Sequence, residues 1–140
     1  MAKRNIWPFT NNAYILIFFI VILIPAIWFL FLNKESDHEM ATETLTGSWV
    51  RSDGGYTIQI MEVKEDGKLE SLYLNPNPIN VGKSEWRIED NFLKIYVELQ
   101  DKNYPGSLYQ LTYDKEKKML YGTYYQAVDK ATFEVYFTKK

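Results

Sequence analysis

Residues 93–99 read Leu-Lys-Ile-Tyr-Val-Glu-Leu, an alternation of apolar side chains with polar or amphipathic ones. A period of two residues is typical of a β-strand that buries one face and exposes the other. The same period recurs at Tyr56, Ile58 and Ile60, at Tyr109, Leu111 and Tyr113, and at Phe133, Val135 and Phe137. No segment after residue 33 shows a helical period, so the C-terminal part of the chain is predicted to be all-β.

Turn-forming residues separate the predicted strands. Seven such turns lie at residues 52–55, 65–67, 75–78, 89–91, 101–106, 114–118 and 128–130. Seven turns join eight strands, and short strands joined by hairpins are typical of an up-and-down barrel, whose closure removes exposed sheet edges. We therefore expect a small eight-stranded meander barrel over residues 45–140. An open sandwich is the alternative, because turns alone do not establish closure.

Residues 13–32 form an apolar run that contains no charge. At about 1.5 Å per residue, a helix of this length crosses the ~30 Å hydrocarbon core of a membrane. Lys3 and Arg4 precede the run and acidic residues follow it, so the positive-inside rule places residues 1–12 in the cytoplasm and the C-terminal domain outside. An uncleaved anchor is favoured over a signal peptide because the run is about twice as long as a usual signal-peptide core.

Residues 33–44 are polar and acidic, which predicts a flexible linker with His38 as a bystander. The remaining residues, 45–140, suffice for one small domain. Its thirteen Lys and Arg nearly balance its fourteen Asp and Glu, so we expect no nucleic-acid partner.

Residues 45–49 read Leu-Thr-Gly-Ser-Trp. The Gly47-x-Trp49 element resembles the Gly-x-Trp that opens the first strand of calycins, the lipocalin and avidin-like barrels. The resemblance implies a barrel in which Trp49 plugs one end and a basic residue of the last strand, here Lys139 or Lys140, covers it. The tryptophans that line the ligand site of avidin have no counterparts in this chain.

Three longer strings, at residues 75–81, 101–107 and 122–128, resemble a group of small bacterial envelope proteins of unassigned function. This resemblance implies a bacterial envelope protein and supplies no activity. Together with the apolar run and its flanking charges, it predicts a single-pass protein of the bacterial inner membrane whose C-terminal domain faces the periplasm.

Successive turns of a meander alternate between the two ends of the barrel. The first, third, fifth and seventh turns share one end, called the loop end here because its connections are long and rich in Asn, Pro and Tyr. The opposite end, called the helix end, carries the tight charged turns and the attachment of the anchor. Seven residues of the loop end are predicted to bind a ligand or partner: Asn75, Asn77, Asn80, Asp101, Asn103, Tyr104 and Gln126.

Four tyrosines, Tyr56, Tyr109, Tyr113 and Tyr124, are predicted to point inward. They either line a shallow pocket or fill the barrel, and filling is favoured because side chains fill small barrels. The acids at the loop end are turn residues, and the chain has no cysteine and no recognisable catalytic, metal or cofactor motif.

We therefore expect a non-enzymatic binding or accessory module of the cell envelope, without a cofactor. Its expected partners are the membrane, through residues 13–32, and either an envelope protein or a small saccharide or amphipathic ligand. The alternatives are a structural subunit of a membrane assembly and, less favoured, a small hydrolase or isomerase.

Overall fold

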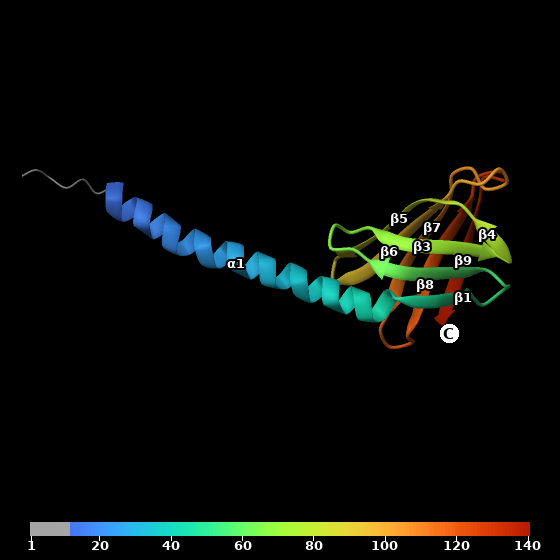
Figure 1. The fold of residues 1–140 in the computed structure, drawn as a ribbon, viewed down its shortest axis with the longest axis horizontal. Helices are drawn as coiled ribbons and strands as arrows, with labels where there is room; N and C mark the ends of the chain where they lie inside the picture. The colour runs from blue at the N-terminus through green and yellow to red at the C-terminus, as the bar shows by residue number, and fades with distance from the viewer. Residues whose placement is uncertain (1–11) are drawn as a thin grey trace, which may run out of the picture. The chain divides into compact units, whose positions relative to one another are not determined.

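Antiparallel strands make up most of the chain after residue 46. The computed structural model describes residues 12–140, and the side chains of residues 24, 25 and 27–140. One helix precedes nine strands (Figure 1). In chain order the elements are α1 (Asn12–Leu45), β1 (Gly47–Arg51), β2 (Thr57–Val63), β3 (Leu69–Asn75), β4 (Asn77–Ile79), β5 (Val81–Glu89), β6 (Phe92–Leu99), β7 (Ser107–Asp114), β8 (Met119–Gln126) and β9 (Ala131–Lys139).

The strands form one sheet that curls into a nearly closed barrel (Figure 1). Their order is β4-β3-β2-β1-β9-β8-β7-β6-β5, so the first strand pairs with the last, with Trp49 opposite Lys139. At the seam, Lys68 forms an isolated antiparallel bridge with Glu85 of β5. The predicted antiparallel meander and barrel are confirmed, but the strands number nine rather than eight.

The ninth strand is β4, in a segment predicted to be a turn. Asn75 pairs with Asn77 and Tyr73 with Ile79, so the chain reverses tightly there. Pro78 is tolerated because β4 ends the sheet order, where a missing N–H costs no ladder bond on the open side. After Asn80 the chain continues into β5 in the same direction as β4. The extra strand therefore adds no reversal of direction, and the turns remain divided between the two ends of the barrel as predicted.

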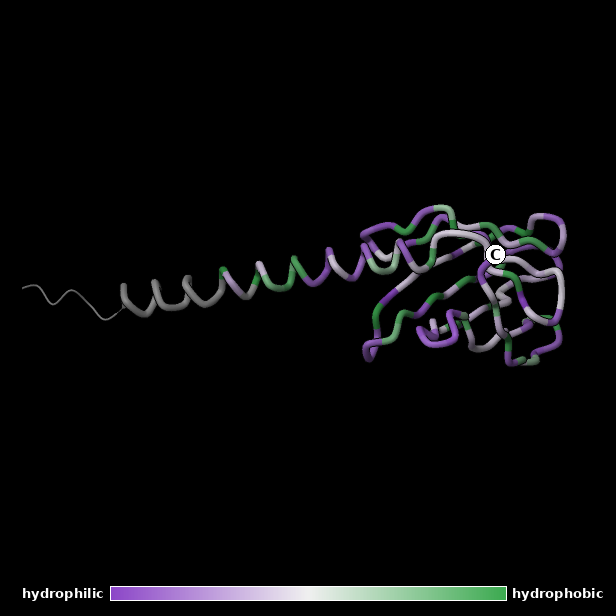
Figure 2. Tube along the Cα trace, turned by 90° about the horizontal axis from the view of Figure 1, so that it is seen from below, coloured by the Kyte–Doolittle hydropathy of each residue, from purple (hydrophilic) through white to green (hydrophobic). Residues whose placement is uncertain are grey.

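The alternating residues fill the interior as the period predicts. Leu93, Ile95, Val97 and Leu99 of β6 are each at most 2% exposed. Figure 2 shows the alternation as changes between hydrophobic green and hydrophilic purple along the strands. Between β5 and β6, Asp90 and Asn91 have φ of 52° and 64°, as a two-residue type I′ hairpin requires.

The segment 33–44 is helical and not a flexible linker. The chain divides into two compact units after Ser36, and the last turns of α1 belong to the barrel unit. Ala41 and Leu45 are fully buried, and the Nε2 of His38 donates a hydrogen bond of 2.8 Å to the carbonyl oxygen of Val63. Both expectations, a flexible linker and a bystander histidine, are therefore wrong, because tertiary contacts order this acidic segment.

Trp49 closes the helix end of the barrel. It is 1% exposed, and its Nε1 donates to the carbonyl oxygen of Leu45 at 2.8 Å. The Nζ of Lys139 lies 5.6 Å from the centroid of the Trp49 ring, so the predicted lysine cover is confirmed. Gly47 has φ of 129°, and a Cβ atom there would stand 3.0 Å from Cε of Lys139. Glycine thus leaves room for the lysine stem.

The predicted membrane span, residues 13–32, lies within α1. The side chains of residues 13–23 and all of residues 1–11 lie outside the described part of the structure. In the part that is described, no helix reaches the length and hydropathy of a membrane span.

Candidate functional site

Strand directions bring the predicted site residues to one end of the barrel. Asn75 closes β3, and Tyr104 lies in the loop between β6 and β7. The Nδ2 of Asn75 donates a hydrogen bond of 2.6 Å to the phenolic oxygen of Tyr104. The Nδ2 of Asn80 donates a hydrogen bond of 2.8 Å to Oδ1 of Asp101. These two bonds tie the loop of residues 100–106 to the end of β3 and the start of β5.

The other three predicted residues differ in exposure. Asn77 and Asn103 are exposed on the rim of the loop end, whereas Gln126 closes β8 and is half-buried. Gln126 therefore lies closer to the interior than the two exposed amides do.

An arginine at the end of β1 organises the floor of the loop end. The side chain of Arg51 is 10% exposed, and its Nε lies 2.5 Å from Oδ1 of Asp53. Its Nη1 donates to the hydroxyl of Tyr109 at 3.0 Å, and its guanidinium carbon lies 3.8 Å from the centroid of the Tyr56 ring. Arg51 thus combines an ion pair, a hydrogen bond and a cation–π contact in one place.

Two buried tyrosines continue this network into the barrel. The hydroxyls of Tyr73 and Tyr109 are 2.8 Å apart. Burial raises the pKa of Tyr109 to about 12 and also raises the pKa of Tyr73. Both phenols therefore stay protonated at neutral pH and act as neutral hydrogen-bonding groups instead of bases.

A stack of aromatic rings leads from the interior to the mouth. The rings of Tyr109 and Tyr124 are stacked with centroids 4.4 Å apart, and Phe133 stacks on Tyr124 at 6.5 Å. Tyr124 is 7% exposed but Phe133 is 48% exposed. The stack therefore ends in a ring that presents apolar surface to solvent at the loop end.

These groups surround a cavity of about 560 Å³. Three of the predicted site residues, Asn75, Tyr104 and Gln126, line it. The other lining residues are Arg51, Asp53, Tyr56, Tyr73, Tyr124, Thr132, Phe133 and Glu134. The other four predicted residues, Asn77, Asn80, Asp101 and Asn103, do not line this cavity.

Several residues of the cavity, Phe133 and Tyr73 among them, were not singled out from the sequence for this site. Phe133 fits the period of β9, but its place beside the turn at residues 128–130 is the signal that puts it at the mouth. Tyr73 belongs to β3, whose polar residues hide the strand period. In contrast, Tyr113, predicted to share an interior with Tyr109, packs edge-on against Trp49 at the helix end.

The cavity is suited to binding. Amide, hydroxyl, guanidinium and carboxylate groups surround an exposed ring face, which provides directional hydrogen bonds beside one stacking contact. The acid and the base nearest each other, Asp53 and Arg51, are already paired.

Comparisons with protein-family models, with curated proteins and with solved structures returned no match. The function of this chain must therefore be inferred from the geometry of its own residues.

Proposed function

We propose that the loop end of the barrel binds a small saccharide without transforming it. The observation that carries this proposal is the half-exposed face of Phe133 at a cavity ringed by Asn75, Gln126 and Tyr104. A sugar ring presents an apolar face for stacking and hydroxyls at its edge for hydrogen bonding. Amide side chains suit those hydroxyls because each amide both donates and accepts.

The filled interior favours a saccharide over an amphipathic ligand. Tyr73, which lines the cavity, is 1% exposed, and Tyr109 and Phe137, which do not line it, are fully buried, so side chains fill the barrel interior. An acyl chain needs a deep apolar cavity, whereas this cavity ends on hydroxyl groups and on Arg51. A single polar ring of sugar size is the better match.

The chain acts as a membrane-anchored accessory module, with the barrel in the periplasm of a bacterial envelope. The apolar run of residues 13–32 supports an anchor, and so does the exposure of its described side chains: Trp28, Leu30 and Phe31 are between 66% and 69% exposed. Such exposure is costly in water and favourable in lipid. The Gly47-x-Trp49 element beneath Lys139 supports a calycin-like relationship, as a proposal.

The proposal is tested by applying the full chain to a printed array of monosaccharides and disaccharides. A polyoxyethylene detergent is required, because maltoside and glucoside detergents carry competing sugars. Phe133→Ala should lose capture, whereas Phe92→Ala, which removes a ring that is 52% exposed near the helix end, should retain it. If no saccharide is captured, or if both variants behave alike, the proposal is wrong.

A further inference from the structure

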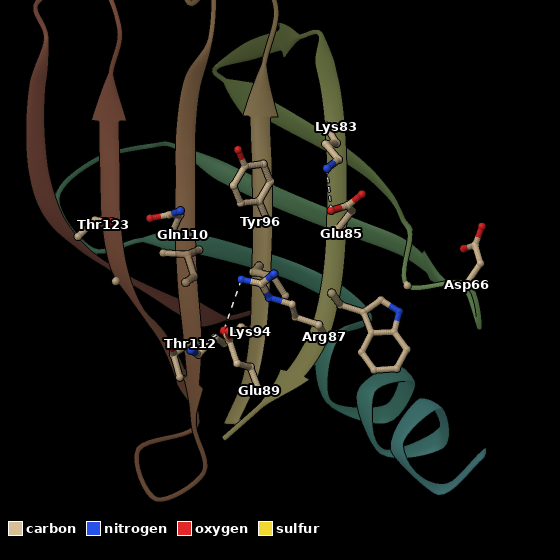
Figure 3. A pocket seen from close by; sticks show the side chains of 15 residues that line it. Asp66, Lys83, Glu85, Arg87, Glu89, Lys94, Tyr96, Gln110, Thr112 and Thr123 are labelled. Carbon is tan, nitrogen blue, oxygen red and sulfur yellow. Dashed lines mark hydrogen bonds and ion pairs between the residues drawn. The ribbon is translucent and has the colours of Figure 1, made fainter. Parts of the chain in front are cut away.

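A second cavity lies on the outer face of the barrel, across strands β5 to β8 (Figure 3). It measures about 760 Å³. Most of its lining residues are at outward-facing positions of these strands, and Asp66 and Gly67 of the turn between β2 and β3 complete it. The register aligns Thr123, Gln110, Tyr96 and Glu85 in one row across the four strands. Adjacent strands lie about 4.8 Å apart, so this row spans about 14 Å. The cavity is therefore an elongated groove, called the outer groove here.

Backbone atoms form part of the floor of the outer groove. Gly122 of β8 lines it, and a Cβ atom at this position would stand 2.0 Å from the carbonyl oxygen of Gln110. No larger residue fits while β7 and β8 keep this separation. Gly122 pairs with the buried residues Leu111 and Val135, so it belongs to the inward-facing row of β8 and only its backbone contributes to the groove.

The charges of the groove neutralise one another. Six ionisable side chains line it, three basic and three acidic: Lys83, Arg87, Lys94, Asp66, Glu85 and Glu89. The Nζ of Lys83 lies 3.0 Å from Oε2 of Glu85. Oε2 of Glu89 forms two ion pairs, with Nζ of Lys94 at 2.7 Å and with Nη2 of Arg87 at 3.4 Å. A strongly charged polymer or an anionic membrane gains little here, since each nearby charge already has an opposite neighbour.

Uncharged polar groups occupy the middle of the groove. Gln110, Thr112 and Thr123 stand on adjacent strands, with the ring of Tyr96 beside them (Figure 3). The Nζ of Lys83 lies 5.6 Å from the centroid of that ring. Hydroxyls, an amide and one aromatic ring are the groups that bind neutral hydroxyl-rich ligands.

We infer that the outer groove binds an extended neutral polysaccharide chain. The length of the polar row exceeds what one sugar ring needs, and the balanced charge fits a ligand without net charge. An extended peptide is the poorer match, because β6 and β7 are paired on both sides and offer no free edge for strand addition. This site is separate from the loop-end cavity and goes beyond the function proposed above.

The test uses three neutral hexasaccharides, cellohexaose, maltohexaose and hexa-N-acetylchitohexaose, with the full chain in a polyoxyethylene detergent. Isothermal titration calorimetry should show binding of at least one of them. The double variant Gln110→Ala/Thr123→Ala and the single variant Tyr96→Ala should each bind about tenfold more weakly or worse, as the loss of one or two ligand hydrogen bonds or of a ring contact implies. Tyr136→Ala is the matched control, because Tyr136 is 44% exposed on the outer face of β9 and does not line the groove.

The variants change surface residues, and circular dichroism during heating will verify that they fold. Affinity that is insensitive to salt supports the inference, since a neutral ligand has no charge to screen. Absence of binding by all three hexasaccharides, equal affinity of parent and groove variants, or a steep fall of affinity with salt would overturn it. If Phe133→Ala alone loses hexasaccharide binding, the hexasaccharide binds at the loop-end cavity. That result would overturn the inference about the outer groove and would not contradict the proposed function of the loop-end cavity.

Discussion

The Nζ of Lys139 lies over the ring of Trp49, 5.6 Å from its centroid, and donates a hydrogen bond of 2.9 Å to the carbonyl oxygen of Thr44. The same nitrogen lies 3.4 Å from the carbonyl oxygen of Glu43. The last carbonyl groups of a helix lack intrahelical partners and carry partial negative charge. The final strand therefore supplies the cation that caps α1, and joins the helix, β1 and β9 at one end of the barrel.

Trp49→Ala should lower the free energy of unfolding by about 3–5 kcal/mol, because it removes a fully buried ring from the end of the core. Trp49→Phe should cost less, since it keeps most of the packing and loses the hydrogen bond to Leu45. Urea denaturation followed by circular dichroism measures both. A Trp49→Ala protein that melts within a few degrees of the parent would show that the barrel does not depend on this plug.

Lys139→Met should cost about 1 kcal/mol, because the methionine stem can still cover Trp49 but cannot donate to the helix carbonyls. Lys140→Met is the matched control, since its side chain is exposed at the next position. The two midpoints of urea unfolding should differ, and equal midpoints would argue against the cap.

Alkaline pH should destabilise the barrel through its buried phenols. Burial raises the pKa of Tyr109 to about 12, from the ordinary tyrosine value of about 10. As the pH rises from about 10 to about 12, the unfolded chain loses the Tyr109 proton that the folded barrel keeps, so the free energy of unfolding falls. Below about pH 10 both states keep this proton, and the stability is not reduced. The expected loss is about 1 kcal/mol per pH unit. Urea titrations at several pH values should show at least this slope, and Tyr109→Phe should reduce it to the part that Tyr73 contributes.

Two exposed amides of the loop end should be dispensable for stability. Asn77→Ala/Asn103→Ala should change the free energy of unfolding by less than about 0.5 kcal/mol, because both residues are exposed. Tyr104→Phe should cost about 1 kcal/mol, because it removes the acceptor of the Asn75 amide. If the double variant unfolds and Tyr104→Phe does not, the roles assigned to these residues are reversed.

The orientation of the chain is tested by a fusion of alkaline phosphatase after Lys140, in a bacterial host. Lys3 and Arg4 should hold the N-terminus in the cytoplasm, so the phosphatase should be exported and active. Replacing both with glutamate should reduce the active fraction. Cytoplasmic retention of the parent fusion would contradict the proposed topology.

The strand pattern predicted the barrel because burial alternates wherever β-strands enclose a core. Leu93 to Leu99 show this period without interruption, and their apolar members are buried as expected. The alternation of turns between two ends also held, since β4 continues into β5 without reversing the chain. Local sequence carries these features, because period and turn chemistry are local properties.

The helical segment of residues 33–44 and the loop-end cavity were not predicted, because both depend on contacts between residues far apart in the chain. His38, Ala41 and Leu45 share one helical face by their spacing of three and four residues, but acidic neighbours obscure that face. The carbonyl group that receives His38 is 25 residues away. The cavity likewise depends on the distance between Arg51 and Tyr109, which are 58 residues apart in the chain. Neither contact has a local signature.

The most direct test of the loop-end proposal is a nuclear magnetic resonance titration of the full chain with the monosaccharide that the array selects. The side-chain amide resonances of Asn75 and Gln126 should shift together and saturate, because both residues line the cavity. The amide of Asn91, in the hairpin at the helix end, should not move. Saturable shifts at Asn91 without shifts at Asn75 and Gln126, or no saturable shift at all, would contradict the account.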